Sequence, residues 1–265
     1  MMNGPALFDP RPVAAGTTQI GAWMPIPGFG VLPVNTYVIQ SAEPVLVDTG
    51  LAACRDEFMA HLRQTLDPTE LRWIWITHAD ADHVGNLEAV LAEAPNARVV
   101  TTFLGMAKMG LQGIALDRVH LLNPGQQLHV GDRLLRAVSP PTYDAPETTG
   151  LFDPSTRTLF SADSFGALLE APVESASEVA ASALRDGCIG WATIDAPWLS
   201  LVGSSELATA LDPIRQLKPA TILSSHLPPA QGLNDTLFGH LDAARSAPRF
   251  AGPDQKAFAQ MIAAA

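Results

Sequence analysis

Buried strands that end in acidic or histidine side chains are the feature that most restricts how this chain can fold. The run WIWITHADADHVGN, residues 73–86, places two histidines and two aspartates within six positions directly after an apolar segment. Four other apolar segments are followed in the same way by Asp48, Asp144, Asp163 and His226. In layered α/β folds, residues that follow strands at one edge of a sheet lie close together. We therefore expect these side chains to form one metal-binding site.

The rest of the chain alternates predicted strands and helices. Strands are predicted at residues 36–40, 44–50, 72–77, 98–102, 119–123, 126–130, 133–139, 149–153, 157–163 and 220–225. Helices are predicted at residues 51–66 and 84–94, in the Ala-rich region up to about residue 217, and twice after the last strand. This order indicates an α/β protein with stacked sheets covered by helices. Nothing between the two halves resembles a linker, so we predict one domain over residues 1–265.

Charge and composition exclude several classes of protein. The net charge of −11 disfavours nucleic acid and anionic membranes as partners. No window reaches the roughly 18 uninterrupted apolar residues that a membrane-spanning helix needs. The N-terminal residues do not resemble a secretory signal, and Cys54 and Cys188 form no CxxC motif. We therefore expect a cytoplasmic protein that binds a small-molecule ligand or substrate, with a homodimer left open as its oligomeric state.

Four segments in order, VDTG, THADADH, SADSFG and SSHLPP, resemble the metallo-β-lactamase superfamily. The resemblance implies a four-layer αββα sandwich with a dinuclear metal cleft. Within the superfamily, LFSADSFG and the D-x-P-E-T run are most similar to the flavodiiron and oxygen-binding diiron branch. Flavodiiron enzymes carry a flavodoxin domain after this one, and this sequence lacks it. A redox partner is therefore expected to act in trans.

The resemblance also implies a role for each residue of the site. One metal would be bound by His78 and Asp80, and the other by Asp82, His83 and His226, with Asp163 as the bridge. Asp48 would brace the ligand loop without binding metal. Capping the helix predicted to start at Leu51 is an alternative or additional role for Asp48.

Two positions depart from the superfamily pattern. Asp80 stands where the second histidine is usual, and the diiron branch also has an acid there. The later histidine is absent, and the Pro-acid pair after it places Asp144 at the ligand position, with Tyr143 as the alternative. Asp82 and Tyr143 are the candidates for catalytic residues.

The residue types themselves indicate which metals fit. Three histidines and up to four aspartates without a thiolate form a hard nitrogen-and-oxygen site, which suits iron, zinc or manganese. Two cations about 3.5–4 Å apart need a bridging anion between them. We expect two divalent or trivalent ions and favour iron.

Three functions are compatible with such a site. The first is a non-haem diiron protein that binds or reduces O2 or NO. The second is a hydrolase whose metal-bound hydroxide attacks an ester, thioester, lactam or phosphoester. The third is a binding module with a structural metal, which is disfavoured because structural zinc sites are usually rich in cysteine. The remaining histidines, His61, His120, His129 and His240, are predicted to be surface or core residues, and Trp191 and Trp198 to line the cleft or the core.

Overall fold

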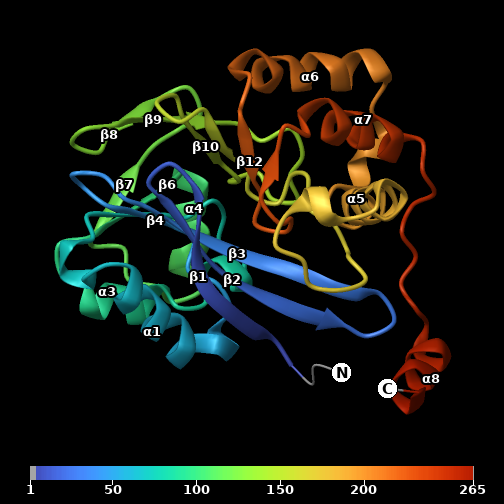
Figure 1. The fold of residues 1–265 in the computed structure, drawn as a ribbon, viewed down its shortest axis with the longest axis horizontal. Coiled ribbons are helices and arrows are strands. Elements are labelled where there is room, and N and C mark those ends of the chain that lie inside the picture. Colours follow the sequence, from blue (N-terminus) through green and yellow to red (C-terminus); the bar gives the residue numbers. More distant parts are fainter. Residues whose placement is uncertain (1–3, 265) are drawn as a thin grey trace.

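Two β-sheets stacked face to face form the centre of the computed structural model, which describes residues 4–264 (Figure 1). The first sheet has the strand order β1-β2-β3-β4-β5-β6-β7 and the second has the order β13-β12-β11-β10-β9-β8. The strands of the first sheet are β1 Ala6–Ala14, β2 Thr17–Ile26, β3 Gly30–Ile39, β4 Val45–Val47, β5 Trp73–Trp75, β6 Arg98–Thr101 and β7 Val119–Leu121. Those of the second are β8 Gln127–His129, β9 Leu134–Val138, β10 Gly150–Asp153, β11 Thr158–Phe160, β12 Thr221–Leu223 and β13 Ala230–Gln231.

Helices lie around the two sheets (Figure 1). They are α1 Arg55–Thr65, α2 Ala81–Val84, α3 Leu87–Glu93, α4 Phe103–Leu111, α5 Ala181–Asp195, α6 Ser204–Leu217, α7 Asn234–Arg245 and α8 Gln255–Ala264, with short 3-10 turns at Ala52–Cys54, Pro68–Glu70, Ala176–Glu178 and Pro197–Leu201. Helices α1, α3 and α4 pack on the first sheet, and α5, α6 and α7 pack on the second. The result is the αββα layering of the metallo-β-lactamase fold, as the sequence predicted.

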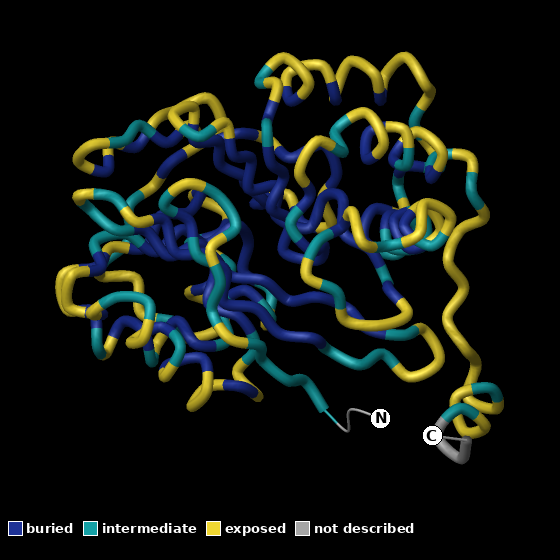
Figure 2. Tube along the Cα trace, in the orientation of Figure 1, coloured by how far each residue is buried: buried dark blue, intermediate teal, exposed yellow. Residues whose placement is uncertain are grey.

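The strands next to the site are apolar on both faces because each face is buried. In β4, Val45 and Val47 point into the core between the two sheets, whereas Leu46 points to the layer of helices. Successive side chains of a strand alternate between its faces, so a central strand with helices on one side and a sheet on the other must be apolar throughout. Figure 2 shows these strands buried inside more exposed helices.

Several element boundaries differ from the prediction. Helix α1 begins at Arg55 rather than at residue 51, after a 3-10 turn. The helix predicted at 84–94 begins at Leu87 as α3, and the short helix α2 before it was not predicted. Between the two lies Asn86, whose buried side-chain amide donates to the carbonyls of Thr49 (2.7 Å) and Leu51 (3.1 Å). Strands β1 and β2 and helix α4 were not predicted.

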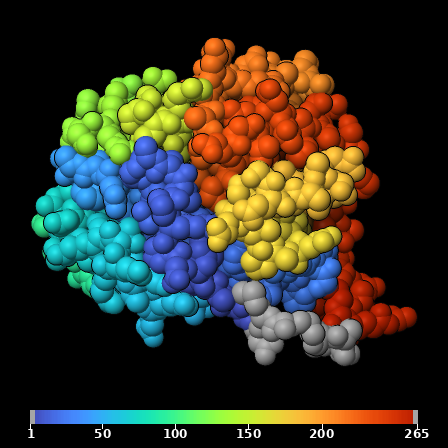
Figure 3. Space-filling model, viewed as in Figure 1, coloured from blue at the N-terminus to red at the C-terminus, as the bar shows by residue number. Residues whose placement is uncertain are grey.

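The two ends of the described chain contact other parts of the molecule. Figure 3 shows the N-terminal strand on one face of the molecule, between the cyan segment that carries α1 and the yellow segment around α5. On this strand, Arg11 forms an ion pair with Glu174 (3.6 Å) and donates to the carbonyl of the same residue. At the other end, the segment between α7 and α8 packs the ring of Phe250 against Phe29. Among the helices of residues 4–264, none is both long and apolar enough to cross a membrane.

Candidate metal centre

The strand directions bring the predicted ligands to one edge of the sandwich. Strands β4 and β5 are parallel, as are β11 and β12, so the two strands of each pair end on the same side. Asp48 and His78 follow the first pair, whereas Asp163 and His226 follow the second. The loop between β9 and β10, which carries Asp144, opens on the same edge.

Asp48 holds the ligand loop in place through hydrogen bonds. One of its oxygens accepts a hydrogen bond from the backbone N–H of Thr77, and the other from the hydroxyl of the same residue, both at 2.8 Å. Nδ1 of His83 also lies 2.9 Å from the carboxylate of Asp48. An Nδ1–H that donates to Asp48 leaves Nε2 of His83 as the metal-facing nitrogen. Asp48 does not cap the predicted helix, because Leu51 holds that position without a side-chain bond.

Four ligand atoms converge on one side of the centre. Oδ1 of Asp163 lies 3.2 Å from Nε2 of His83 and 3.3 Å from Nε2 of His226. Oδ2 of Asp82 lies 3.6 Å and 3.4 Å from the same two nitrogens. Four ligands about 2.1 Å from a tetrahedral ion are separated by about 3.4 Å, so this spacing fits a shared cation. His226 is oriented by its Nδ1, which donates to the carbonyl of Pro33 at 2.8 Å.

The second group of ligand atoms lies on the other side of Asp163. His78, Asp80 and Asp144 each offer one atom within 4.8 Å of the others. Oδ2 of Asp163 is 3.4 Å from Nε2 of His78, so the two oxygens of Asp163 face the two groups. Tyr143 precedes Asp144 in the same loop, and 41% of its surface is exposed. Its ring packs against Trp198 at 5.3 Å between centroids.

Buried atoms without hydrogen-bond partners show that the centre fits metal ions. Within residues 4–264, Nε2 of His78, Nε2 of His83 and Oδ1 of Asp163 are buried and make no well-formed hydrogen bond. Buried polar atoms are nearly always paired, and unpaired ones are costly. Three such atoms pointing at common positions are explained when metal ions supply the missing partners.

The charged groups of the centre shift one another's pKa values. Burial alone lowers the pKa of His226, but Asp163 and Asp82 outweigh it and raise the pKa to about 9. Burial likewise opposes protonation of His83, whose pKa the nearby carboxylates raise well above its usual range. Burial raises the pKa of Asp163, yet the three imidazoles hold it well below its ordinary value. These acids and imidazoles therefore require positive charge among them, which protons or metal ions can provide.

Two further side chains reach the centre from α4 and α5, and no sequence motif indicates either of them. Nζ of Lys108 lies 2.6 Å from Oδ1 of Asp80 and 2.8 Å from the buried carboxylate of Glu147. Asp195 is buried, and one of its oxygens lies within 4.8 Å of oxygens of Asp144 and Asp163. Burial first, and then the charges of Asp163 and Asp144, raise the pKa of Asp195 to about 8.

Of the other aromatic and histidine residues, Trp191 is a neighbour of the centre. The ring of Trp191 lies 4.6 Å from that of His226, and its Nε1 donates to the carbonyl of Asp163 at 3.1 Å. Trp191 therefore forms one wall of the centre, whereas Trp198 contacts Tyr143. Among the described residues, no metal-type group includes the remaining histidines, His61, His120, His129 and His240.

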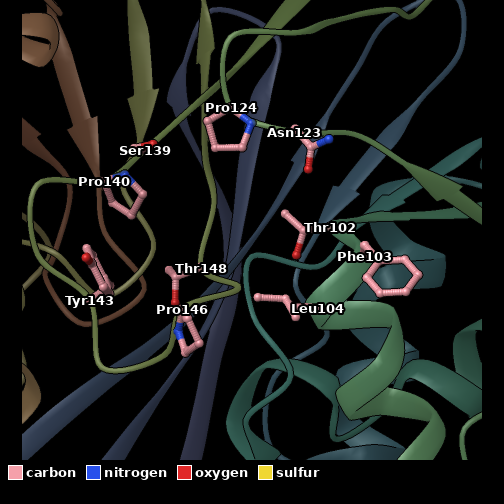
Figure 4. A pocket seen from close by; sticks show the side chains of 10 residues that line it. All are labelled: Thr102, Phe103, Leu104, Asn123, Pro124, Ser139, Pro140, Tyr143, Pro146 and Thr148. Carbon is pink, nitrogen blue, oxygen red and sulfur yellow. The ribbon is translucent and has the colours of Figure 1, made fainter.

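A cavity of ≈ 280 Å³ lies beside the loop that carries Asp144. Its lining includes Tyr143 and Pro146 from this loop and Phe103 and Leu104 from the start of α4 (Figure 4). The candidate metal ligands do not line it. The cavity is thus a partly apolar recess next to the centre, and Tyr143 belongs to this recess.

The model of one protein family matches most of the chain. Its description is metallo-beta-lactamase superfamily, and it covers residues 29–226. The chain belongs to this superfamily. The family resemblance found in the sequence is therefore confirmed.

Curated proteins similar to the chain include a diflavin flavoprotein and a nitric oxide reductase. The chain is 33% identical over 140 residues to "Diflavin flavoprotein A 1" of Synechocystis, which covers 50% of the chain and 23% of that protein. It is 26% identical over 196 residues to "Nitric oxide reductase" of Moorella thermoacetica, which covers 72% of the chain and 48% of that protein. The chain thus spans less than half the length of either relative.

Solved structures of flavodiiron proteins share the fold. Rubredoxin oxygen:oxidoreductase of Desulfovibrio gigas superposes with a TM-score of 0.79 at 17% identity over 91% of this chain and 62% of that one. The flavodiiron protein of Giardia intestinalis superposes with a TM-score of 0.75 at 19% identity over 90% of this chain and 59% of that one. At this identity the likeness establishes the fold alone.

Proposed function

We propose that the chain is a non-haem diiron protein that binds or reduces O2 or NO. The observation that carries the proposal is Asp163, whose two oxygens face two separate groups of ligand atoms. One group contains His78 with Asp80 and Asp144, and so holds a single imidazole among carboxylates. Oxygen-rich sets of this kind favour hard cations such as iron and manganese.

The chain's own side chains orient the ligands and restrict the centre. Asp48 fixes the ring of His83, and the carbonyl of Pro33 fixes that of His226. Trp191 holds the backbone beside Asp163 and covers one side. Iron ions held by His78, His83, His226 and the aspartates around Asp163 would supply open coordination positions and electrons for O2 or NO. We expect a redox partner acting in trans to resupply those electrons during turnover.

A zinc-dependent hydrolase is the second candidate. It is favoured by the group of Asp82, His83, His226 and Asp163, in which each carboxylate oxygen lies 3.2–3.6 Å from both imidazole nitrogens, a spacing that suits zinc as well as iron. On this alternative, Tyr143 and the adjacent recess would contact an ester, thioester, lactam or phosphoester substrate.

Metal content and NO binding distinguish the two candidates. Protein purified from iron-replete cells should contain two irons per chain and, once reduced without oxygen, should develop a new visible absorption on addition of NO. The matched control is Asp163→Ala, which should lose both the iron and the absorption. Two zincs per chain with esterase activity and no response to NO would contradict the diiron proposal and support the hydrolase.

A further inference from the structure

The ionised side chain of Asp195 occupies a position that is unfavourable unless a cation lies beside it. It is the last residue of the 15-residue helix α5, and only 7% of its surface is exposed. Its Oδ2 is buried and has no hydrogen-bond partner among residues 4–264. A carboxylate at a helix C-terminus also meets the negative end of the helix dipole. Both burial and the dipole therefore disfavour the charged side chain in the absence of a cation.

The surroundings of Asp195 show where that cation would lie. Oxygens of Asp195, Asp144 and Asp163 lie within 4.8 Å of one another. Two oxygens that share one ion at about 2.0–2.2 Å can be up to about 4.4 Å apart, so only a small adjustment is needed. Asp144 also belongs to the group with His78 and Asp80, which links Asp195 to that side of the centre.

The charge of this side supports the same conclusion. Asp80, Asp144, Asp163 and Asp195 converge here, and the nearby ammonium group of Lys108 contacts only Asp80 among them. Lys108 is also paired with the carboxylate of Glu147. Asp195 is buried, whereas Asp144 is exposed. A buried carboxylate that lacks a paired cation is strongly disfavoured, so positive charge is needed beside Asp195.

We propose that Asp195 is a ligand of the metal on the His78 side and that, with Asp144, it replaces the imidazole absent from this chain. This inference rests on the dinuclear centre of the proposed function. A third carboxylate beside Asp80 and Asp144 makes this position more anionic than the one shared by His83 and His226. The His78 side is therefore selective for hard ions, Mn²⁺ and iron over zinc.

Titration of the metal-free protein with Mn²⁺ tests the assignment. Binding is followed calorimetrically and by the electron paramagnetic resonance of coupled manganese ions. We expect Asp195→Asn to weaken the second equivalent by about 10-fold or more and to leave the first unchanged. Asp195→Ala should also weaken the second equivalent. It is included because the amide oxygen of Asn could still bind the ion. The matched control is Asp186→Asn, which removes a solvent-exposed acid from the same helix.

Thermal unfolding of the metal-free variants separates a ligand from a structural residue. A ligand without its ion is an unpaired buried acid, so metal-free Asp195→Asn should be at least as stable as the metal-free wild type. A lower stability of that variant would overturn the assignment. Equal affinity of the wild type and Asp195→Asn for two Mn²⁺ ions would also overturn the assignment. So would a third ion that binds the wild type and not Asp195→Asn. A wild type that binds fewer than two ions would instead contradict the dinuclear centre itself.

Discussion

Asp48 controls the centre through hydrogen bonds rather than through contact with a ligand position. Its backbone φ is 57°, in the left-handed region that Asn and Asp tolerate better than most residues. This conformation turns the carboxylate toward Thr77 and His83 and keeps it away from the converging atoms. The orientation of His83 is therefore set by a residue 35 positions earlier in the sequence.

Asp48→Asn tests this orienting role with little change in backbone or shape. We expect about a 10- to 100-fold loss of affinity for the metal shared by Asp82, His83 and His226, because ligand-orienting partners have effects of this size. Calorimetric titration of the metal-free variant measures the loss. The control Asp132→Asn alters a turn at the far edge and should bind like the wild type. Equal affinities in both variants would show that His83 needs no such partner.

The sequence predicted the residues of the centre where a contiguous motif carries them. His78, Asp80, Asp82 and His83 lie within six positions after a strand, and strand direction alone places Asp163 and His226 nearby. Asp144 and Tyr143 could not be separated, because their loop has no regular periodicity to fix which side chain points inward. Lys108 and Asp195 were missed because each is a single charged residue in a helix without a ligand motif.

Helix α4 shows why some elements escaped prediction. Phe103, Leu104 and Leu111 are all largely exposed in it, so its apolar residues do not form a single buried stripe. The helix nevertheless matters to the centre. It carries Lys108, whose ammonium lies between Asp80 and the buried carboxylate of Glu147.

Removing the ammonium group of Lys108 should destabilise the fold through Glu147. We expect Lys108→Met to lower the free energy of unfolding of the metal-free protein by about 1–2 kcal/mol, a modest value because the ammonium is partly exposed. Urea unfolding measures the change. Adding Glu147→Gln should recover most of it, because the double variant no longer buries an unpaired acid. If Lys108→Met is as stable as the wild type, the ion pair has no structural role.

Across the whole molecule, the ligands come from both halves of the sandwich. His78, Asp80, Asp82 and His83 follow strands of the first sheet, whereas Asp144, Asp163 and His226 follow strands of the second. The facing sheets are already joined by a buried core that includes Trp75 and Phe160. This stacking was predictable from the alternation of strands and helices, but its register was not, because it depends on side-chain packing between the sheets.

Removal of metal should therefore lower the stability of the whole molecule. An ion present at 1,000 times its dissociation constant stabilises the folded state by about 4 kcal/mol, which for a chain of this size is a Tm shift of roughly 10 °C. We expect a chelator to lower the Tm of the wild type by at least this amount. The chelator should lower the Tm of Asp163→Ala very little, since this one substitution already removes a ligand from both groups. A wild-type Tm that does not respond to the chelator would contradict this coupling.

The edge of the sandwich opposite the ligands consists of turns and is suited to chemical attachment. Because the strands run as described, the turns at residues 15–16, 41–43, 131–132 and 154–157 all lie away from the ligands. These turns and the residues beside them contact one another there, for example through the ion pair of Arg133 with Asp153 and the hydrogen bond from the N–H of Ala42 to Asp132. A fluorophore or immobilisation tag attached to these turns would leave the edge with the candidate metal centre free. The protein can thus be fixed to a surface or an electrode with that edge toward the solution.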